Sequence, residues 1–500
     1  MVTGSYILAL DQGTTGSTAL LFDEKGHVIS RAYREIRQIF PQAGWVEHDP
    51  DEIYQSCVSV GNEAVREAGI PFSKVMGLGI TNQRESVVVW ERSSGKPVHN
   101  SICWQCRRTS GLCEELKQEG LEKFIRQKTG LQSDAYFSGT KIKWTLDNIP
   151  DGWKRAKQGD LVCGTIDTWL VWNLTRGKIH VTDYSNASRT MLFNINTLQW
   201  DSDLLQMLGI PGMILPQVLP SSMIYGETAE GLFDNAHIPI SGIAGDQQAS
   251  LFGQSCHQKG MAKNTYGTGS FVLMNTGEKP VFSEKGIITT VAWGLGDQAT
   301  YAMEGSIFIT GAVIQWLRDN LGLINTAAES ETLAATVPNN GGVYFVPAFV
   351  GLGAPHWDMY ARGSILGLTR GSNKGHLARA ALEAIAYQTR DVVDVIQGES
   401  NSTIPVLRVD GGGSVNNLLM QFQADILGIP VQRAQIAEIT ALGAAYLAGL
   451  ALGVWRGVEE TEKQWHSIAT FEPQMSVDER ETLYHHWKRA VSRSQQWEEP

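Results

Sequence analysis

Short apolar runs that end in polar or glycine-rich turns fill the first ninety residues, and this pattern predicts strands. Residues 6–10 are apolar throughout and are typical of a buried strand. Residues 19–22 and 28–33 predict two further strands, separated by a turn at residues 23–26. The N-terminal segment is therefore expected to form an antiparallel meander.

A helical pattern follows this meander. Residues 51–69 place apolar side chains at helical spacing and end in a glycine. Residues 75–81 and 87–90 return to strand patterns, joined by the polar loop at residues 82–86. Strands that alternate with helices on this scale indicate an α/β fold.

A second series of the same kind begins near residue 240. Residues 238–244 predict a strand that leads directly into a glycine, an acid and two amides. Residues 264–270 then place glycines, a threonine and a serine before a predicted strand at 271–274, which echoes residues 13–15. We expect two similar α/β halves with phosphates between them; one long α/β domain with repeated turns is the alternative. The expected boundary lies at residues 254–263, which are polar and without clear periodicity.

A third cluster of glycines follows the strand pattern at residues 406–408. Three consecutive glycines within residues 409–414 let the backbone lie flat against a planar ligand, although a tight strand-to-helix turn would need them too. A helix is predicted to follow at residues 416–427. In another predicted helix, residues 307–321, Gly311 and Gln315 lie one turn apart and could receive an adenine or ribose edge, or could be ordinary core packing.

The turn after the first strand has the chemistry of a phosphate site. Gly13 permits close approach of the backbone, Thr14 and Thr15 add hydroxyl donors, and successive N–H groups in such a turn suit phosphate. Asp11 at the end of the strand could hold a metal ion, directly or through water. No Gly-Lys-Ser/Thr follows, so the turn is not a P-loop, and a strand that ends in such a turn also occurs in proteins that bind nothing.

Composition narrows the range of partners. The 500 residues are 42% hydrophobic and 19% charged, with a formal net charge of −11. Because nucleic acids are bound through clustered Lys and Arg, we expect no nucleic-acid partner, whereas a small phosphorylated ligand needs only a few local donors.

The cysteine distribution and the N-terminal sequence predict a cytoplasmic protein. The six cysteines are scattered, and the N-terminal residues lack the basic and apolar stretches of a secretory signal, so free thiols are expected. Residues 441–455 are short and rich in Ala and Gly, which favours a buried helix over a membrane span.

Eight motifs occur in an order that resembles the FGGY carbohydrate kinase family, and within it the members that phosphorylate glycerol. They are DQGTTGS at 11–17, GWVEHDP at 44–50, TNQRE at 81–85, WQCRRT at 104–109, GIAGDQQAS at 242–250, YGTGSF at 266–271, GLGAPHWD at 351–358 and VDGGGSVNN at 409–417. The resemblance implies an α/β fold of two RNase H-like domains around a catalytic cleft, as in actin, hexokinase and Hsp70. The first domain would span residues 1–254, with the polyol site and first phosphate loop. The second would span residues 255–500, with the second phosphate loop and the adenosine site.

The resemblance also implies transfer of the ATP γ-phosphoryl group to glycerol, giving sn-glycerol 3-phosphate and ADP. Asp246 corresponds to the general base that accepts the hydroxyl proton. The positions that match the family's polyol contacts are Arg84, Glu85, Trp104, Tyr136, Asp246, Gln247 and Phe271. Trp104 and Phe271 would pack against the carbon backbone of the polyol, and the others would bind its hydroxyls.

The nucleotide and metal positions follow from the same resemblance. Those that match the nucleotide contacts are Thr14, Thr15, Gly16, Gly267, Thr268, Gly311, Gln315, Gly412 and Asn416. Mg²⁺ is implied because phosphoryl transfer requires charge on the phosphate oxygens to be offset, with Asp11 and Asp246 as partners through water. Family members commonly form homodimers or homotetramers.

Four alternatives are weighed against this function. Another sugar kinase of the same family, such as one for a pentulose, and a non-catalytic ATP switch of the actin or Hsp70 type both share the phosphate turns. Cys103 and Cys106 have a spacing found in zinc sites, but no second Cys pair or His pair accompanies them. A dehydrogenase is disfavoured because no turn gives the full dinucleotide fingerprint.

The sequence departs from its relatives at two places. Relatives usually have Ser-Ser-Arg where this chain has Gly16, Ser17 and Thr18, so a hydroxyl and a positive charge near the phosphates are missing and weaker nucleotide binding is expected. Some bacterial relatives are controlled by fructose 1,6-bisphosphate at a loop with an arginine, where this chain has His237. Others are activated by a phosphotransferase partner that phosphorylates a histidine near this region. The sequence predicts neither kind of control.

Overall fold

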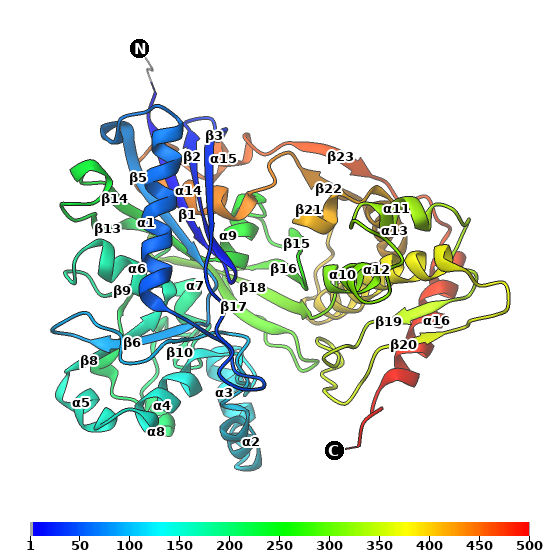
Figure 1. Cartoon of the computed structure of the whole chain (residues 1–500), viewed down its shortest axis with the longest axis horizontal. Helices are drawn as coiled ribbons and strands as arrows, with labels where there is room; N and C mark the ends of the chain where they lie inside the picture. The colour runs from blue at the N-terminus through cyan, green and yellow to red at the C-terminus, as the bar shows by residue number, and fades with distance from the viewer. Residues whose placement is uncertain (1–3, 500) are drawn as a thin grey trace.

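One continuous mixed sheet of thirteen strands runs through the computed structural model, which describes residues 4–499 (Figure 1). Five strands at its N-terminal end have the order β3-β2-β1-β5-β14. They are β1 (Tyr6–Gln12), β2 (Gly16–Asp23), β3 (Val28–Glu35), β5 (Val75–Asn82) and β14 (Pro239–Gly245). The first three strands are antiparallel, whereas β5 and β14 run parallel to β1. The predicted meander is confirmed.

The second half of the chain repeats this arrangement in the order β18-β16-β15-β21-β22. These strands are β15 (Ala262–Tyr266), β16 (Ser270–Gly277), β18 (Gln298–Ile307), β21 (Leu407–Asp410) and β22 (Val431–Ala434). The three strands β15, β16 and β18 are antiparallel, and β21 and β22 run parallel to β15. The same order and directions occur in both halves, which confirms the predicted fold class of two similar α/β units.

Two strands join the halves into one sheet. β13 (Ser222–Glu227) pairs with β14 on one side and with β17 (Ile288–Leu295) on the other, through Ser222 and Leu295. β17 in turn forms a hairpin with β18. β23 (Ser467–Phe471) pairs with β22 and ends the sheet beyond the second half.

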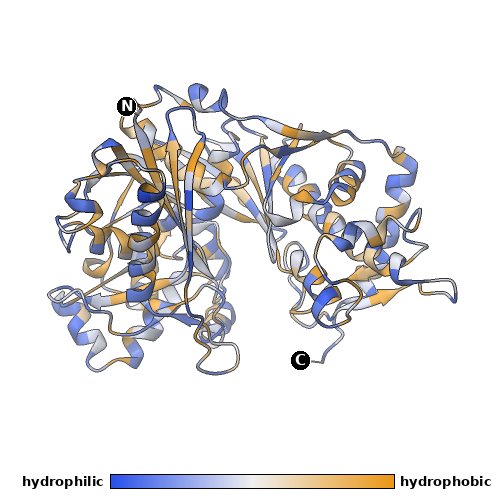
Figure 2. Ribbon diagram, turned by 45° about the horizontal axis from the view of Figure 1, so that its top comes forward, coloured by the Kyte–Doolittle hydropathy of each residue, from blue (hydrophilic) through white to orange (hydrophobic). Residues whose placement is uncertain are grey.

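Helices bury both faces of the first strand. Leu8 and Leu10 of β1 belong to the core formed with α1 (Pro50–Glu67), whereas Ile7 and Ala9 face the core formed with α9 (Asp246–Gly253) and α14 (Ile439–Ala451). Figure 2 shows hydrophobic residues gathered along these strands and the helices that cover them. A strand that is covered on both faces needs an uninterrupted apolar sequence, which explains residues 6–10.

Packing crosses the expected boundary between the halves. The helix α14 comes late in the chain but lies against β1, β5 and β14 of the first half (Figure 1). The β17–β18 hairpin also contacts the first half, where the Tyr301 hydroxyl donates to the carbonyl of Ile195 at 2.7 Å. The division at residues 254 and 255 stays a prediction.

The remaining elements extend each half. A second sheet in the first half has the order β4-β7-β6-β8. Its strands are β4 (Glu47–His48), β7 (Ser101–Ile102), β6 (Val87–Glu91) and β8 (Leu161–Thr165). The same part of the chain forms the helices α2 (Ser110–Gln118), α3 (Glu122–Thr129), α4 (Ser138–Asn148), α5 (Gly152–Gln158), α6 (Ile166–Leu174), α7 (Tyr184–Ala187) and α8 (Ser202–Leu208). Short strands are β9 (Val181–Asp183), β10 (Phe193–Asn194), β11 (Gln199–Trp200), β12 (Gln217–Leu219), β19 (Tyr344–Val346) and β20 (Ser364–Leu366). The second half adds α10 (Gly311–Asp319), α11 (Glu329–Ala334), α12 (Lys374–Ser400), α13 (Asn417–Leu427), α15 (Val458–Glu462) and α16 (Val477–Ser494).

Two predicted elements have different bounds in the structure. The first turn is shorter than the sequence pattern indicated, because the antiparallel pairing of Asp11 with Thr18 and of Gln12 with Ser17 continues both strands toward it. The helix predicted for residues 307–321 is shorter and spans Gly311–Asp319. Ile307 still belongs to β18, and the N–H of Thr310 donates to the Thr268 carbonyl of the second turn at 2.9 Å. These long-range contacts replace the local helical pattern at its first residues.

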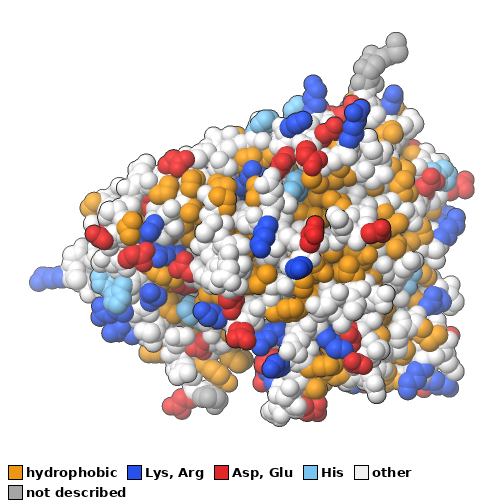
Figure 3. Space-filling model, turned by 180° about the vertical axis from the view of Figure 1, so that it is seen from behind, with side chains coloured by type: hydrophobic (Ala, Val, Ile, Leu, Met, Phe, Trp, Pro, Cys, Tyr) orange, Lys and Arg blue, Asp and Glu red, His pale blue; other side chains and the backbone are white. Residues whose placement is uncertain are grey.

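The surface and the thiols agree with the composition. On the face shown in Figure 3, Lys and Arg side chains are interspersed with Asp and Glu and do not gather in a stripe. All six cysteines are buried free thiols, as expected. Within residues 4–499 no helix is both long and apolar enough to cross a membrane.

The segment 44–50 connects the second sheet to the first turn. His48 is fully buried, and its Nε2 lies 2.9 Å from Oε1 of Gln38. The Gln38 amide in turn donates to the carbonyl of Thr14 at 2.9 Å. Next to it, Glu47 accepts a hydrogen bond from Arg108 at 2.6 Å. The motif around His48 therefore supports the first turn from behind.

Burial lowers the pKa of His48 to about 4, which makes stability depend on pH. The unfolded chain binds a proton near the ordinary pKa of about 6.5, so this contribution is complete above that pH and is lost as the pH falls toward 4. The free energy of unfolding in urea should fall between about pH 7.5 and about pH 4.5 in both proteins. In His48→Gln this fall should be smaller by about 2–3 kcal/mol than in the unmodified protein. Equal losses in the two proteins would contradict this assignment.

Candidate active site

Three parallel strands of the first half end at one edge of the sheet, and the candidate catalytic residues follow them. In the register of the sheet, Gln12 of β1 and Gly245 of β14 both lie beside Asn82 of β5. Arg84 and Glu85 follow β5 directly, and Asp246 follows β14. Ligand sites of open α/β sheets form at the carboxyl ends of the strands, which explains why these motifs converge.

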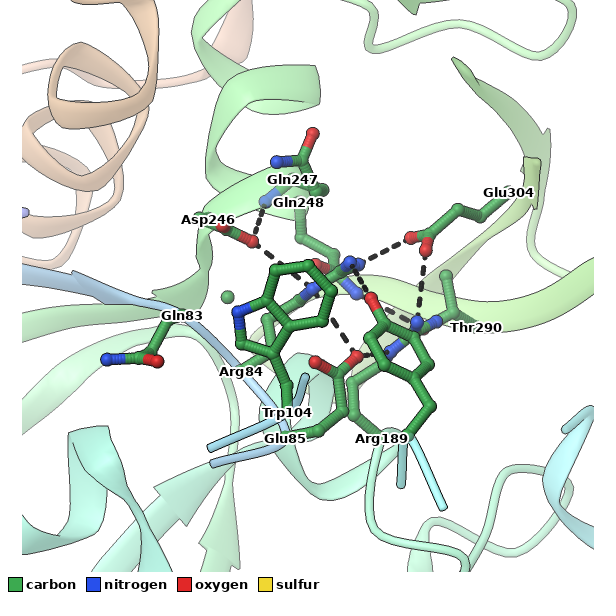
Figure 4. A network of polar contacts seen from close by, with 12 residues as sticks. Gln83, Arg84, Glu85, Trp104, Arg189, Asp246, Gln247, Gln248, Thr290 and Glu304 are labelled. Atoms are coloured by element: carbon green, nitrogen blue, oxygen red, sulfur yellow. Dashed lines mark hydrogen bonds and ion pairs between the residues drawn. The ribbon is translucent and has the colours of Figure 1, made fainter. Parts of the chain in front are cut away.

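Arg84 is the centre of this group (Figure 4). Its Nε lies 3.2 Å from Oδ1 of Asp246 and 3.5 Å from Oε1 of Glu85. One terminal nitrogen donates to the Tyr136 hydroxyl at 2.7 Å, and the guanidinium carbon lies 5.3 Å from the centre of the Phe271 ring. The structure thus brings five of the predicted polyol residues together around one guanidinium.

The backbone around Arg84 is unusually constrained. Its φ is 59°, in the left-handed region that only glycine adopts without cost. A Cβ atom on Gly245 would lie 2.7 Å from Cγ of Arg84. Glycine is therefore required at position 245, because the Arg84 side chain packs directly against its Cα. Strained backbone of this kind persists where the surroundings determine one conformation, as at active sites.

Asp246 is the most accessible charged group of the cluster. Its side chain is 28% exposed, compared with 2% for Arg84 and 1% for Glu85. Its Oδ1 accepts from the backbone N–H of Gln247 at 2.7 Å, whereas its Oδ2 has no hydrogen bond within residues 4–499. Burial, together with Glu85, raises the pKa of Asp246 against the opposing effect of Arg84. A carboxylate with a free oxygen and a raised pKa is suited to accept a proton.

Gln247 is positioned by a residue that the sequence analysis missed. Lys263 is fully buried on β15, and its ammonium donates to Oε1 of Gln247 at 2.5 Å and to the Thr265 hydroxyl at 2.8 Å. The Gln247 amide nitrogen is therefore the end left for a ligand. Burial lowers the pKa of Lys263 to about 8.

Two more charged residues were missed. Glu304 of β18 accepts from Arg84 at 2.5 Å and from Arg189 at 3.0 Å, and Arg189 also donates to Glu85 at 2.7 Å. Burial disfavours the Glu304 carboxylate, but Arg189 and Arg84 outweigh it and hold its pKa below the ordinary value. A glutamate within the apolar segment of residues 301–309 was the available signal, because a buried charge requires a partner.

Trp104 links the polyol wall to the first turn. Its ring lies edge-on to Tyr136, with centres 5.5 Å apart. Its indole Nε1 donates to the Thr14 hydroxyl at 2.9 Å. Because this hydroxyl then accepts from Trp104, its own proton is directed elsewhere, toward a ligand at the turn.

The first turn itself is closed by the backbone. The Gly13 N–H donates to the carbonyl of Gly16 at 2.9 Å, and Thr15 is exposed. Gly16 is buried in β2, where a Cβ atom would lie 2.7 Å from the Tyr33 ring and 2.6 Å from the carbonyl oxygen of Arg34. The Arg34 carbonyl and the Tyr33 ring thus explain why this position is a glycine, and a nucleotide contact at Gly16 stays a prediction.

Asp11 lies beside this turn and close to Asp246. Burial, followed by the Asp246 carboxylate, raises the pKa of Asp11 to about 7. Within residues 4–499 its carboxylate has no hydrogen bond or ion pair, and no group of three His, Cys, Asp or Glu residues forms a metal cluster. Asp11, a carboxylate without a protein partner beside a second carboxylate that keeps one oxygen free, fits a metal ion bound largely through water.

The second turn is built against two other predicted segments. The Gly311 N–H donates to the Gly267 carbonyl at 3.0 Å, and the Ala312 N–H donates to the Thr268 carbonyl at 3.1 Å. A Cβ atom on Gly311 would lie only 2.5 Å from the Gly267 carbonyl oxygen, so glycine is required for this approach. The turn and α10 therefore meet as one unit, with Gln315 exposed one helical turn further along.

The third glycine cluster lies next to this unit. A Cβ atom on Gly411 would lie 2.5 Å from the Tyr266 carbonyl oxygen, which places the cluster directly against the residue before the second turn. Gly412 is exposed. The Asn416 side chain accepts from the N–H of Leu419 at 2.9 Å and caps α13. This cap accounts for asparagine at that position, and its nucleotide contact stays a prediction.

Comparisons with known proteins assign this site to a class. Residues 6–253 match the N-terminal domain and residues 262–452 the C-terminal domain of the FGGY family of carbohydrate kinases. The chain belongs to the FGGY family of carbohydrate kinases.

Particular relatives are close. The chain is 60% identical to glycerol kinase 2 of Thermotoga maritima and 58% identical to glycerol kinase of Caldanaerobacter subterraneus, in each case over 99% of both chains. The structure resembles that of Plasmodium falciparum glycerol kinase with ADP, with a TM-score of 0.93 and 37% identity over 98% of each chain. A xylulose kinase from Lactobacillus acidophilus has the same fold, with a TM-score of 0.87 at 23% identity.

The bond between Trp104 and Thr14 can be tested with nucleotide alone. Trp104→Phe keeps an aromatic wall but removes the indole donor, so ADP should bind about fivefold more weakly, the equivalent of one hydrogen bond of about 1 kcal/mol. Titration calorimetry measures this. The matched control is Trp200→Phe, which loses an indole bond to the Pro216 carbonyl and should leave ADP affinity unchanged. If the two variants bind ADP equally well, Trp104 does not orient Thr14.

The structure also sharpens the expectation for position 18. Thr18 lies directly opposite Asp11 across the β1–β2 ladder, so the two side chains share a face. Thr18→Arg would place a cation beside the turn and should tighten ADP binding by an amount on the order of 1 kcal/mol. Thr18→Gln is the uncharged control. Unchanged affinity in the arginine variant would place position 18 beyond reach of the phosphates.

Proposed function

We propose that this chain transfers the γ-phosphoryl group of ATP to a terminal hydroxyl of glycerol, giving sn-glycerol 3-phosphate and ADP. The observation that carries the proposal is the Asp246 carboxylate, which keeps one oxygen free beside Arg84 in a family of carbohydrate kinases. Full-length identity to glycerol kinases supports glycerol over other polyols.

Asp246 acts as the general base. Its free Oδ2 accepts the proton of the attacking hydroxyl as the oxygen approaches phosphorus. Arg84 and Glu85 bind the other hydroxyls: within residues 4–499 Oε2 of Glu85 has no hydrogen bond and is available to accept one. Trp104 and Phe271 form the apolar walls against the carbon backbone, and Tyr136 holds Arg84 from the side.

The nucleotide is held by the two turns. Backbone N–H groups and the hydroxyls of Thr14, Thr15 and Thr268 bind phosphate oxygens, and Gly311, Gln315 and Gly412 line the nucleoside. Mg²⁺ would be held through water by Asp11 and Asp246, where it would offset the charge that develops on the phosphate oxygens. Positioning and electrostatics then supply most of the catalysis.

Three further properties belong to the same proposal. The protein works in the cytoplasm, has glycerol and ATP and no nucleic acid as partners, and assembles into homodimers or homotetramers. Sedimentation velocity measures the last of these directly.

Asp246→Asn tests the base. The variant keeps the shape of the side chain but accepts a proton poorly, so turnover with glycerol should fall about 10²–10⁴-fold while glycerol still binds. A coupled assay of ADP release across glycerol, dihydroxyacetone, glyceraldehyde and several pentuloses measures rate and substrate choice together. The control is Asp203→Asn, an exposed carboxylate on α8. Near-normal turnover of Asp246→Asn would remove Asp246 from this role, and ADP release that no polyol increases would instead indicate an ATP switch.

A further inference from the structure

Four buried charged side chains, two of them from the predicted polyol site, form a closed ring (Figure 4). Arg84 and Glu85 come from the loop after β5, Arg189 from the turn after α7, and Glu304 from the middle of β18. Their side chains are between 0% and 2% exposed. The ring joins segments that are more than two hundred residues apart in the chain.

Each arginine contacts both glutamates. Glu304 uses its two oxygens separately, Oε2 for Arg84 at 2.5 Å and Oε1 for Arg189 at 3.0 Å. Arg189 reaches Glu85 with its Nε at 2.7 Å, and Arg84 closes the ring with its Nε 3.5 Å from the same Glu85 oxygen. The planar guanidinium groups fix the angles between these contacts, which a flexible ammonium could not do.

The charges of the ring balance, and this explains why it can be buried. Two positive and two negative side chains offset one another at short distance, whereas removal of one partner leaves an uncompensated charge. The edge of the ring that faces the ligand site is Arg84, with Asp246 beyond it at 3.2 Å. Whatever holds Arg84 therefore also determines how closely it approaches the base.

We propose that Glu304 and Arg189 are positioning residues for the polyol reaction. They do not contact the polyol; they hold Arg84 and Glu85 in the orientation that binds its hydroxyls, and they keep Arg84 from pairing fully with Asp246. The inference rests on the proposed function. Without Glu304, the nearest remaining anion for the Arg84 guanidinium is Asp246, and a tighter pair between them would cover the base.

Glu304→Gln is the direct test, because it keeps the shape of the side chain and removes its charge. The KM for glycerol should rise about tenfold to a hundredfold, as expected when a binding group is displaced by about 1 Å. The affinity for ADP, measured by calorimetry, should not change, because the nucleotide turns have no contact with Glu304. Arg189→Lys keeps the charge but cannot bridge two glutamates. It should also raise the KM for glycerol, as Glu304→Gln does.

The matched control is Glu383→Gln on α12. Glu383 is also buried and bound to an arginine, Arg379 at 2.9 Å, but it lies outside the ring. A purely structural contribution of Glu304 would lower the unfolding temperature and the amount of active protein at an unchanged KM for glycerol, as in the control. That result, or an unchanged KM in both Glu304→Gln and Arg189→Lys, overturns the inference.

The two proposals fail in different ways. Glycerol-dependent ADP release by the unmodified protein is measured first and tests the proposed function alone. If the unmodified protein is active and the two variants keep its KM for glycerol, only the inference on Glu304 and Arg189 is wrong. If the unmodified protein releases no ADP with glycerol, the proposed function is wrong and the inference falls with it.

Discussion

The buried ring of two arginines and two glutamates is the constraint on which the site depends. Once Glu304 holds one terminal nitrogen of Arg84, the other terminal nitrogen lies toward Tyr136 and Nε lies between Glu85 and Asp246. Tyr136 then packs against Trp104, and Trp104 reaches the first turn. A short series of direct contacts thus connects the substrate wall, the base and the phosphate turn. A change in the ring would displace the side chains in this series.

The doubled sheet explains why these groups meet. Parallel strands in each half end at one edge, which places Asp246, Arg84 and Asp11 together in the first half and the second and third glycine clusters together in the other. Glycines occur where backbone must pass at close range, as at Gly245 beside Arg84 and Gly311 on the second turn. The chemistry is therefore carried by loops, while their positions are set by pairing within the sheet.

Much of the fold and part of the site followed from the sequence. The strand at residues 6–10, the helix after residue 50 and the repeated turns were all predictable, because apolar periodicity and glycine placement act over a few residues. The motif residues from Arg84 to Phe271 were predictable through family resemblance. Lys263, Arg189 and Glu304 were not, because the groups they bind come from segments that are distant in sequence. The start of α10 was predicted too early, because Ile307 pairs in β18 and Thr310 bonds to the second turn, and neither contact is local in sequence.

The sequence by itself determined the elements and the chemistry of the first turn, since backbone preferences and side-chain types are local properties. Only the tertiary structure decided that Gly16 lies under Tyr33, that α14 covers the first half, and that a glutamate on β18 holds Arg84. These outcomes depend on which distant surfaces pack together. A buried charge in a strand shows that a partner must exist, but its identity is fixed only when long-range pairing brings the partner within reach.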